Sequence, residues 1–289
     1  MAQSPKQVFI LAHPAKHSLS PVMHNAAFDY LGLEAVYSPW DVSPEELPEA
    51  MEALRQNDVW GANVTIPHKQ AVMPYLDELS DEAQRIGAVN TIINRRGRLI
   101  GHNSDAQGYI RGLASAGCDL RGKHVLLLGA GGAARAIVYA LLKAGVASLT
   151  IANRNPSRAA DLAEEFQQSK IDPKQHLATV AMEDIASVSS TVDLIVNSTS
   201  VGMAKSGANS FETPLDKRYL PASGCFVSDI VYIPQETRLL KEAKAKGLAV
   251  QNGLAMLVHQ GAISFECWTG QAAPVESMFA ALEKALGTR

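Results

Sequence analysis

Hydrophobic positions in the first hundred residues alternate between short continuous runs and helical spacing. Short runs rich in β-branched and aromatic residues predict strands over residues 8–12, 35–39 and 59–64. Between and after these runs, apolar residues recur every three or four positions, which predicts helices over residues 21–31, 45–56 and 69–76. Two further apolar runs, 88–94 and 99–102, flank a turn at 96–98 and predict a hairpin. Strands that alternate with helices are typical of an α/β domain.

The second half of the chain has the pattern of a parallel sheet. After a connecting helix over 105–116, the continuous apolar run Val125–Leu128 predicts a strand that is buried on both faces. Further strands are predicted over 149–152, 194–196 and 226–229, and helices over 156–166 and 237–246. The tail, 253–270 and 275–286, has helical spacing throughout, and we expect it to pack on the first domain.

The length of 289 residues favours two domains, because one compact core seldom extends so far. We predict one α/β domain made of residues 1–104 and 253–289, and a second α/β domain with a parallel sheet made of residues 105–252. A net charge of -3 provides no field that attracts nucleic acid or an anionic membrane. No apolar run approaches the ~20 residues of a membrane span or forms a signal-peptide core, so we expect a cytoplasmic protein.

Metal ligands and disulfides are not expected. Cys118, Cys225 and Cys267 lie far apart in the sequence and lack the close Cys/His pairing of zinc sites, so we expect buried thiols. His13 and His17 are four residues apart, but Pro14 disfavours the helix that would bring both rings to one ion.

A glycine-rich segment directly after the strand 125–128 is the strongest local motif. Gly129 permits a tight turn, Gly131 allows the backbone to approach a pyrophosphate, and the small Ala134 allows close packing of the following helix on the strand. The pyrophosphate of a bound dinucleotide would lie at the N-terminus of that helix, near its free N–H groups. Residues 105–252 are therefore predicted to form a Rossmann dinucleotide-binding domain, and residues 1–104 with 253–289 an N-terminal α/β substrate domain. A tight strand-to-helix turn without a ligand is the alternative.

The residues after the next strand favour NADP over NAD. Enzymes that use NAD place a carboxylate there against the ribose hydroxyls, whereas this chain has Asn153, Arg154 and Arg158. Two permanently charged guanidinium groups suit the 2′-phosphate of NADP. The alternative is a solvated helix face on which Arg158 pairs with Asp161.

Polar side chains gather at two junctions of the first domain. Asn63, Thr65 and Lys69 surround the turn after a predicted strand, and a lysine in a desolvated cleft can exchange protons with a hydroxyl group. A solvated lysine at the start of a helix is the alternative. Asp105 follows Ser104 at a strand-to-helix junction, where either residue could instead be a helix cap.

Two hydroxyl groups, Ser18 and Ser20, precede Pro21 at a predicted helix start. They could bind a substrate carboxylate or cap that helix.

In combination these segments resemble the shikimate dehydrogenase family, including its quinate/shikimate branch, over almost the whole chain. The resembling segments of the first half are His17–Pro21, His24–Asn25, Asn63–Lys69, Gly87–Thr91 and Gly101–Asp105. Those of the second half are Gly129–Ala134, Asn153–Arg154, Asn197–Met203, Asp229–Tyr232 and Met256–Ala262.

The resemblance implies roles for particular residues. Lys69 and Asp105 would be the catalytic pair, and Ser18 and Ser20 would bind the substrate carboxylate. The remaining substrate contacts would be Asn63, Thr65, Asn90, Tyr232 and Gln260. The cofactor contacts would be Gly129, Ala130, Gly131, Gly132, Ala133, Asn153, Arg154, Arg158, Thr199 and Gly253.

The implied reaction is the reversible, NADP-dependent reduction of 3-dehydroshikimate to shikimate in chorismate and aromatic amino acid biosynthesis. Lys69 would supply the proton to the developing alkoxide, and Asp105 would orient it. The chain departs from the family pattern at Ala106, where glycine is expected, and at Asn155, where members specific for NADP often have threonine. The opening segment Leu11–Lys16 also lacks the usual glycine and larger apolar residue.

Three alternatives remain open at this point. The first is a quinate/shikimate dehydrogenase with relaxed cofactor use, and the second is a methylenetetrahydrofolate dehydrogenase, which the paired serines and Asn103–Asp105 do not suit. The third is a non-catalytic sensor that binds NADP. Both a monomer and a homodimer are compatible with the sequence.

Overall fold

The computed structural model describes residues 4–16, 18–168, 176–204 and 211–287. His17, the second histidine of the pair considered above as metal ligands, lies outside the described residues. The chain divides into two compact units, and each contains its own sheet. Unit 1 is made of Met1–Gly108 and Leu257–Arg289, and unit 2 is Tyr109–Met256. The predicted domain boundaries, after residues 104 and 252, stay a prediction.

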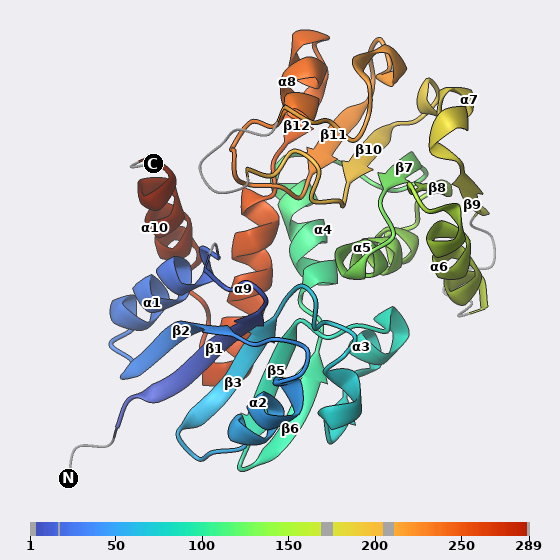
Figure 1. Cartoon of the computed structure of the whole chain (residues 1–289). Helices are drawn as coiled ribbons and strands as arrows, with labels where there is room; N and C mark the ends of the chain where they lie inside the picture. Colours follow the sequence, from blue (N-terminus) through green and yellow to red (C-terminus); the bar gives the residue numbers. More distant parts are fainter. Residues whose placement is uncertain (1–3, 17, 169–175, 205–210, 288–289) are drawn as a thin grey trace. The chain divides into compact units, whose positions relative to one another are not determined.

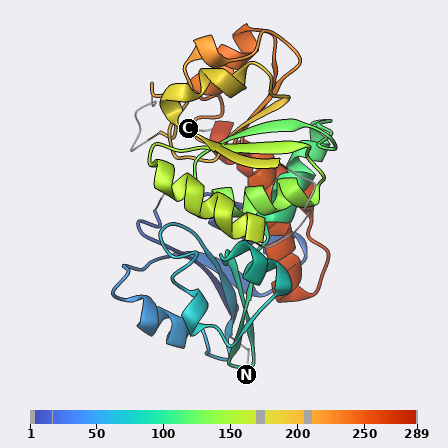
Figure 2. The same ribbon diagram turned by 90° about the vertical axis from the view of Figure 1, so that its right-hand side faces the viewer.

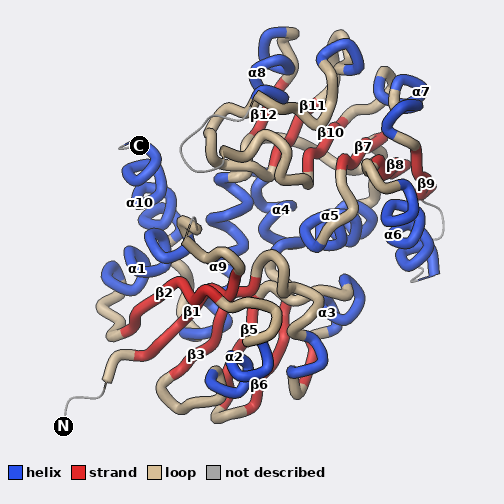
Figure 3. The backbone as a smooth tube through the Cα atoms, in the orientation of Figure 1, coloured by secondary structure: helices blue, strands red, loops and turns tan. Residues whose placement is uncertain are grey.

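Unit 1 contains a six-stranded mixed sheet in the order β2-β1-β3-β5-β6-β4 (Figures 1 and 3). The strands are β1 (Lys6–Ala12), β2 (Ala35–Asp41), β3 (Val59–Val64), β4 (Glu78–Leu79), β5 (Thr91–Arg95) and β6 (Arg98–His102). Strand β1 pairs in parallel with β2 and β3, and β5 pairs antiparallel with β3 and β6, so the predicted hairpin is confirmed. The helices are α1 (Ser20–Tyr30), α2 (Leu47–Ala53), α3 (Asp81–Ile86), most of α9 (Leu254–Thr269) and α10 (Val275–Gly287).

The last two helices belong almost entirely to unit 1, which confirms the prediction that they return to the first domain. Helix α10 lies beside α1 (Figure 1). Helix α9 is fixed to the sheet by Trp268, whose indole N–H donates to the carbonyl of Ile92 at 2.9 Å. Gly61 makes room for this contact, because a Cβ atom there would lie 2.0 Å from that carbonyl oxygen and 2.8 Å from the indole nitrogen.

Unit 2 contains a six-stranded sheet in the order β12-β11-β10-β7-β8-β9, and every pair is parallel, as predicted. The strands are β7 (His124–Leu128), β8 (Ser148–Ala152), β9 (His176–Val180), β10 (Leu194–Asn197), β11 (Phe226–Asp229) and β12 (Ala249–Gln251). The main helices are most of α4 (Asp105–Ser115), α5 (Gly132–Lys143), α6 (Pro156–Gln168), α7 (Ala186–Ser189) and α8 (Arg238–Ala245). Helices α5 and α6 lie side by side on one face of the sheet, and α8 covers the other (Figures 1 and 2).

The register of the parallel strands places their carboxyl ends in one row. Leu128 pairs with Ala152 on one side and with Asn197 on the other, and Asn197 pairs with Asp229. In a doubly wound sheet, ligands bind at this edge. Within the described residues, no helix has the length and hydrophobicity that crossing a membrane requires.

The predicted helix over 69–76 is wrong. These residues form turns and a short 3-10 helix, Met73–Tyr75. Pro74 lacks an N–H group and disfavours the α conformation at the residue before it. In addition, the carbonyl of Lys69 accepts the N–H of Val89 at 2.8 Å, outside any helix. The pattern also failed to predict the short elements α3, β4, β9 and β12.

Candidate functional site

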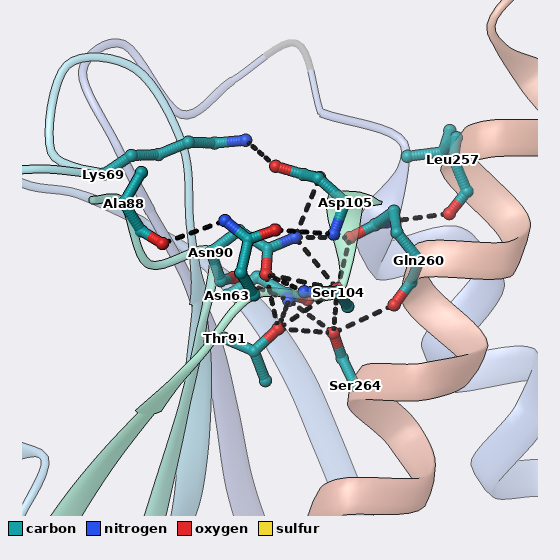
Figure 4. Close-up of polar contacts among 11 residues, drawn as sticks. Asn63, Lys69, Ala88, Asn90, Thr91, Ser104, Asp105, Leu257, Gln260 and Ser264 are labelled. Carbon is teal, nitrogen blue, oxygen red and sulfur yellow. Dashed lines mark hydrogen bonds and ion pairs between the residues drawn. The ribbon is translucent and has the colours of Figure 1, made fainter. Parts of the chain in front are cut away.

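The lysine and the aspartate singled out in the sequence form an ion pair within unit 1. Lys69 Nζ donates to Asp105 Oδ2 at 2.5 Å, and the two side chains are only 14% and 6% exposed (Figure 4). Lys69 follows the turn after β3, and Asp105 is the first residue of α4. The backbone N–H of Asp105 donates to Asn103 Oδ1 at 3.0 Å, which fixes the start of this helix. The alternative of a solvated lysine is therefore wrong.

Asn90 holds the other oxygen of the same carboxylate. Its Nδ2 donates to Asp105 Oδ1 at 2.8 Å, to Ser104 Oγ at 2.9 Å and to Gln260 Oε1 at 3.3 Å. Its Oδ1 accepts the N–H of Ser104 at 2.7 Å and the hydroxyl of Thr91 at 2.9 Å. Asn90 therefore orients Asp105 while Lys69 neutralises it.

A second layer of buried polar groups lies beneath this pair (Figure 4). Asn63 Nδ2 donates to the Asn90 carbonyl and to Ser264 Oγ, both at 3.0 Å. Ser264 Oγ also lies 2.7 Å from Thr91 Oγ1 and 3.1 Å from Ser104 Oγ. Buried polar networks rigidify a site when every member is bonded, as these members are.

Two stacked rings, Tyr37 and His24, lie next to Asn63. Tyr37 Oη donates to Asn63 Oδ1 at 2.8 Å, and the ring of Tyr37 stacks on His24 with centroids 4.5 Å apart. Asn25 fixes the backbone of Tyr37 through two hydrogen bonds of 2.8 and 2.9 Å. Burial lowers the pKa of His24 to about 3, so this ring is neutral.

The other predicted substrate residues of unit 1 surround the same end of the sheet. Ser18 Oγ accepts the N–H of Ser20, the first residue of α1, at 3.2 Å, and Ser20 is buried. Thr65 directly follows β3 and is half-buried. Gln260, on α9, donates from Nε2 to the carbonyl of Leu257 at 2.7 Å, which turns its Oε1 toward Asn90.

In unit 2 the glycine-rich segment forms the turn between β7 and α5. Gly129 has a φ of 112°, and a Cβ atom there would lie 2.6 Å from Ser198 Oγ, so the position requires glycine. Gly131 is the N-cap of α5 and supplies no capping side chain, and a Cβ atom at Gly131 would meet nothing within 4 Å. The N-cap residue thus places no side chain over the N-terminus of α5, where the free N–H groups of a helix suit a pyrophosphate.

The arginines after β8 lack partners in the described part of the chain. Arg154 and Arg158 are both exposed, and no ion pair joins Arg158 to Asp161 among the described residues. Asn155 Oδ1 accepts the N–H of Ser157 at 3.1 Å and its hydroxyl at 2.7 Å, so Asn155 caps α6. Asn153 Nδ2 donates to the carbonyl of Asn155 at 2.9 Å. Two guanidinium groups thus remain available to an anion beside the glycine turn.

The remaining predicted residues of unit 2 lie on loops at the same edge of the sheet. Thr199 follows β10, Tyr232 follows β11, and Gly253 precedes α9. Gly253 packs directly on the preceding loop, since a Cβ atom there would lie 1.9 Å from the carbonyl oxygen of Ile230. The open helix N-terminus and the unpaired arginines at this edge fit a dinucleotide with an additional phosphate.

Fold and site together define an α/β protein with a Rossmann unit and a second unit that carries a buried lysine–aspartate pair. Family models match most of the chain. A shikimate dehydrogenase substrate binding domain matches residues 10–92, a shikimate/quinate 5-dehydrogenase domain matches 112–231, and a shikimate 5′-dehydrogenase C-terminal domain matches 253–283. The chain belongs to the shikimate dehydrogenase family.

Individual relatives agree with this assignment. A shikimate dehydrogenase (NADP(+)) of Symbiobacterium thermophilum is 46% identical over 96% of this chain and 93% of its own length. The structure of the shikimate 5-dehydrogenase of Thermus thermophilus with NADP(H) and shikimate is 42% identical, with a TM-score of 0.85 over 97% of this chain and 100% of its own. A quinate dehydrogenase of Corynebacterium glutamicum in complex with NAD is 32% identical, with a TM-score of 0.88 over 97% of this chain and 99% of its own.

Sequence reasoning missed several members of the unit 1 network. The sequence indicates Ser104 only as a possible helix cap, and its patterns assign no role to Thr91, Tyr37 or Ser264. A signal for Ser264 does exist, because it lies four residues after Gln260 on a helix and thus on the same face.

Proposed function

We propose that the chain catalyses the reversible, NADP-dependent reduction of 3-dehydroshikimate to shikimate in the biosynthesis of chorismate and the aromatic amino acids. The observation that carries the proposal is the buried pair of Lys69 and Asp105 at 2.5 Å. An ammonium group that is fixed by a carboxylate and shielded from water suits the transfer of a proton to a carbonyl oxygen that is being reduced.

Different residues of unit 1 would donate the proton, orient the donor and bind the substrate. Lys69 Nζ would donate the proton to the carbonyl oxygen of the substrate, and its positive charge would stabilise the developing alkoxide before the proton arrives. Asp105 keeps the ammonium group in place, and Asn90 fixes the carboxylate. The proposed substrate-binding residues are Ser18, Ser20, Asn63, Thr65, Asn90 and Gln260, together with Tyr232 of unit 2.

The residues of unit 2 would hold the cofactor. The turn at Gly129–Gly132 and the start of α5 would bind its pyrophosphate, and Arg154 and Arg158 would bind the 2′-phosphate. Thr199 and Gly253, on the loops after β10 and β12, would provide further contacts to the cofactor. NADPH, when bound, supplies the hydride. We further propose that the protein acts in the cytoplasm, as a monomer or a homodimer, with domains bounded after residues 104 and 252.

The test is the absorbance of the nicotinamide band when the purified protein meets each of four pairs: shikimate or quinate as substrate, with NADP or NAD as cofactor. We expect fast reduction of NADP with shikimate and slow or no reaction in the other three pairs. A faster reaction with quinate, or equal use of NAD, would favour the quinate/shikimate branch, to which the relative with bound NAD belongs by its name. No absorbance change in any pair would favour a sensor.

A further inference from the structure

A single buried carboxyl group joins three segments at the carboxyl edge of the unit 2 sheet. Asp229 is the last residue of β11 and is 1% exposed. Its Oδ1 accepts Asn197 Nδ2 at 2.9 Å and the N–H of Val231 at 3.0 Å, and its Oδ2 accepts the hydroxyl of Thr237 at 2.7 Å. These donors come from the end of β10, the loop after β11 and the start of α8.

This carboxyl group has no positive partner in the described part of the chain. No ion pair of Asp229 is found over residues 4–16, 18–168, 176–204 and 211–287. Burial raises its pKa to about 6, although all three hydrogen bonds favour the charged form. A charge that is buried without a counterion destabilises a fold, so Asp229 does not serve to increase stability. The presence of an aspartate at this position is better explained by the loops that it holds in place.

Asn197 extends the constraint to the loop after β10. Its Oδ1 accepts both the N–H of Thr199 at 3.0 Å and the hydroxyl of Thr199 at 2.7 Å. Its Nδ2 also donates to the carbonyl of Val201 at 3.1 Å. Because Asp229 accepts the same amide group, it determines which way Asn197 turns and therefore where Thr199 lies.

Val231 extends the constraint to the other loop. While its N–H donates to Asp229, its carbonyl accepts the N–H of Gly253 at 3.0 Å. Tyr232 is the next residue along the chain. Thr199 and Gly253, which the resemblance assigns to the cofactor, and Tyr232, which it assigns to the substrate, thus all lie on segments that are bonded to Asp229 directly or through one residue. Because the hydride passes directly between the substrate and the nicotinamide ring, segments that meet both belong to that half of the cofactor site.

We propose that Asp229, acting through Asn197 and Val231, is a positioning residue for the nicotinamide half of the dinucleotide and not for its adenosine half. The side-chain hydrogen bonds of Asp229 and Asn197 do not reach the turn at Gly129–Gly132, nor Arg154 or Arg158. The inference rests on the proposed function, because it assumes that a dinucleotide binds at this edge of the sheet.

The test compares two ligands on the full-length protein. NADP contains both halves, whereas adenosine 2′,5′-bisphosphate lacks the nicotinamide half but keeps the 2′-phosphate. We expect Asp229→Ala to raise the Kd of NADP by about tenfold or more, because it leaves three donors unbonded, and to change the Kd of the bisphosphate by less than about twofold. The kcat should fall more than the KM for shikimate rises. Asp229→Asn keeps an acceptor for Asn197 and Val231 and should restore binding to within about threefold of the wild type.

Equal weakening of both ligands would overturn the proposal, since it would mean that Asp229 supports the unit as a whole. If Asp229→Ala does not fold, the proposal is tested by comparing the Kd of NADP with that of the bisphosphate in Asn197→Ala. Hydrogen exchange at the amides of Thr199 and Val231 provides a separate measurement that requires no ligand, and it should be faster in the variant. A wild-type protein that binds neither nucleotide would contradict the proposed function, and unchanged exchange would contradict the role of Asp229.

Discussion

The two units contain buried aspartates in closely similar settings but with opposite electrostatics. Asp105 in unit 1 and Asp229 in unit 2 each accept an asparagine amide, Asn90 at 2.8 Å and Asn197 at 2.9 Å. Asp105 also contacts an ammonium group, whereas the donors to Asp229 among the described residues are all neutral. Burial raises the pKa of Asp229 to about 6.

The difference shows how each unit distributes its charges. Unit 1 pairs Lys69, the proposed proton donor, with an acid that fixes its position. Unit 2 leaves Arg154 and Arg158 unpaired, within the residues that the structure describes, and gives its buried acid no cation. The two arginines are therefore available to an anion, whereas the ammonium group of Lys69 is held by an acid of its own unit.

The largest expected effect comes from removing the cation of the unit 1 pair. We predict that Lys69→Ala lowers kcat by about 10²- to 10⁴-fold, because the proton donor is lost, and that it changes the KM for shikimate far less. Steady-state kinetics with NADP and shikimate measure both constants.

Lys123→Ala is the matched control for this variant. Lys123 also pairs with an aspartate, Asp193 at 3.5 Å, but it is 41% exposed and adjoins the amino end of β7. We expect its kcat to equal that of the wild type. A normal turnover number for Lys69→Ala would remove the contrast between the two units, since neither would then contain a catalytic charge.

The second effect concerns the unpaired arginines of unit 2. We predict that Arg154→Asp lowers the ratio of kcat/KM with NADP to that with NAD by about 10- to 100-fold, because a charge-assisted contact becomes a repulsion. The exposed Arg121, before β7, gives the control Arg121→Asp, for which the ratio should not change. An Arg154→Asp variant that keeps its NADP preference would show that Arg154 does not bind the 2′-phosphate.

The smallest effect is on stability and depends on pH. The pKa of Asp229 is raised from 3.8 to about 6 in the folded protein, so its favourable contribution is complete below pH 3.8 and is lost as the pH rises through 6. Two pKa units correspond to about 3 kcal/mol, of which roughly half falls between pH 5 and 8.

We therefore expect Asp229→Asn, which cannot ionise, to become more stable relative to the wild type as the pH rises over that range. Urea unfolding of both proteins at several pH values measures this difference. A difference that stays constant from pH 5 to 8 would show that Asp229 does not titrate there.

The sequence predicted unit 2 more fully than unit 1, for a physical reason. A glycine turn between a buried strand and a helix is a local motif, and the structure has Gly129 at φ 112° and Gly131 at the N-cap of α5. The unit 1 site depends on contacts between distant segments, such as Lys69 with Asp105 and Asn63 with Ser264. Local patterns carry no information on such contacts, so only the resemblance connected Lys69 with Asp105, and the contact of Asn63 with Ser264 was not predicted at all.

The elements that the pattern failed to predict share a cause as well. Strands β9 and β12 are edge strands of five and three residues, and helix α3 has six, too short for a periodic pattern to develop. Capping chemistry offers a signal for α3, because Ser80 accepts the N–H of Ala83 and Gly87 ends the helix in the left-handed region.

The assembly of unit 1 from two separate stretches of chain has a consequence for synthesis on the ribosome. Unit 2 is one continuous segment, Tyr109–Met256, and can begin to fold as soon as it emerges, whereas unit 1 must wait for Leu257 and the helices that follow. Asn63 meets Ser264 only after 201 further residues have been added. The nascent chain should therefore acquire the ability to bind nucleotide before it acquires a finished proton donor site.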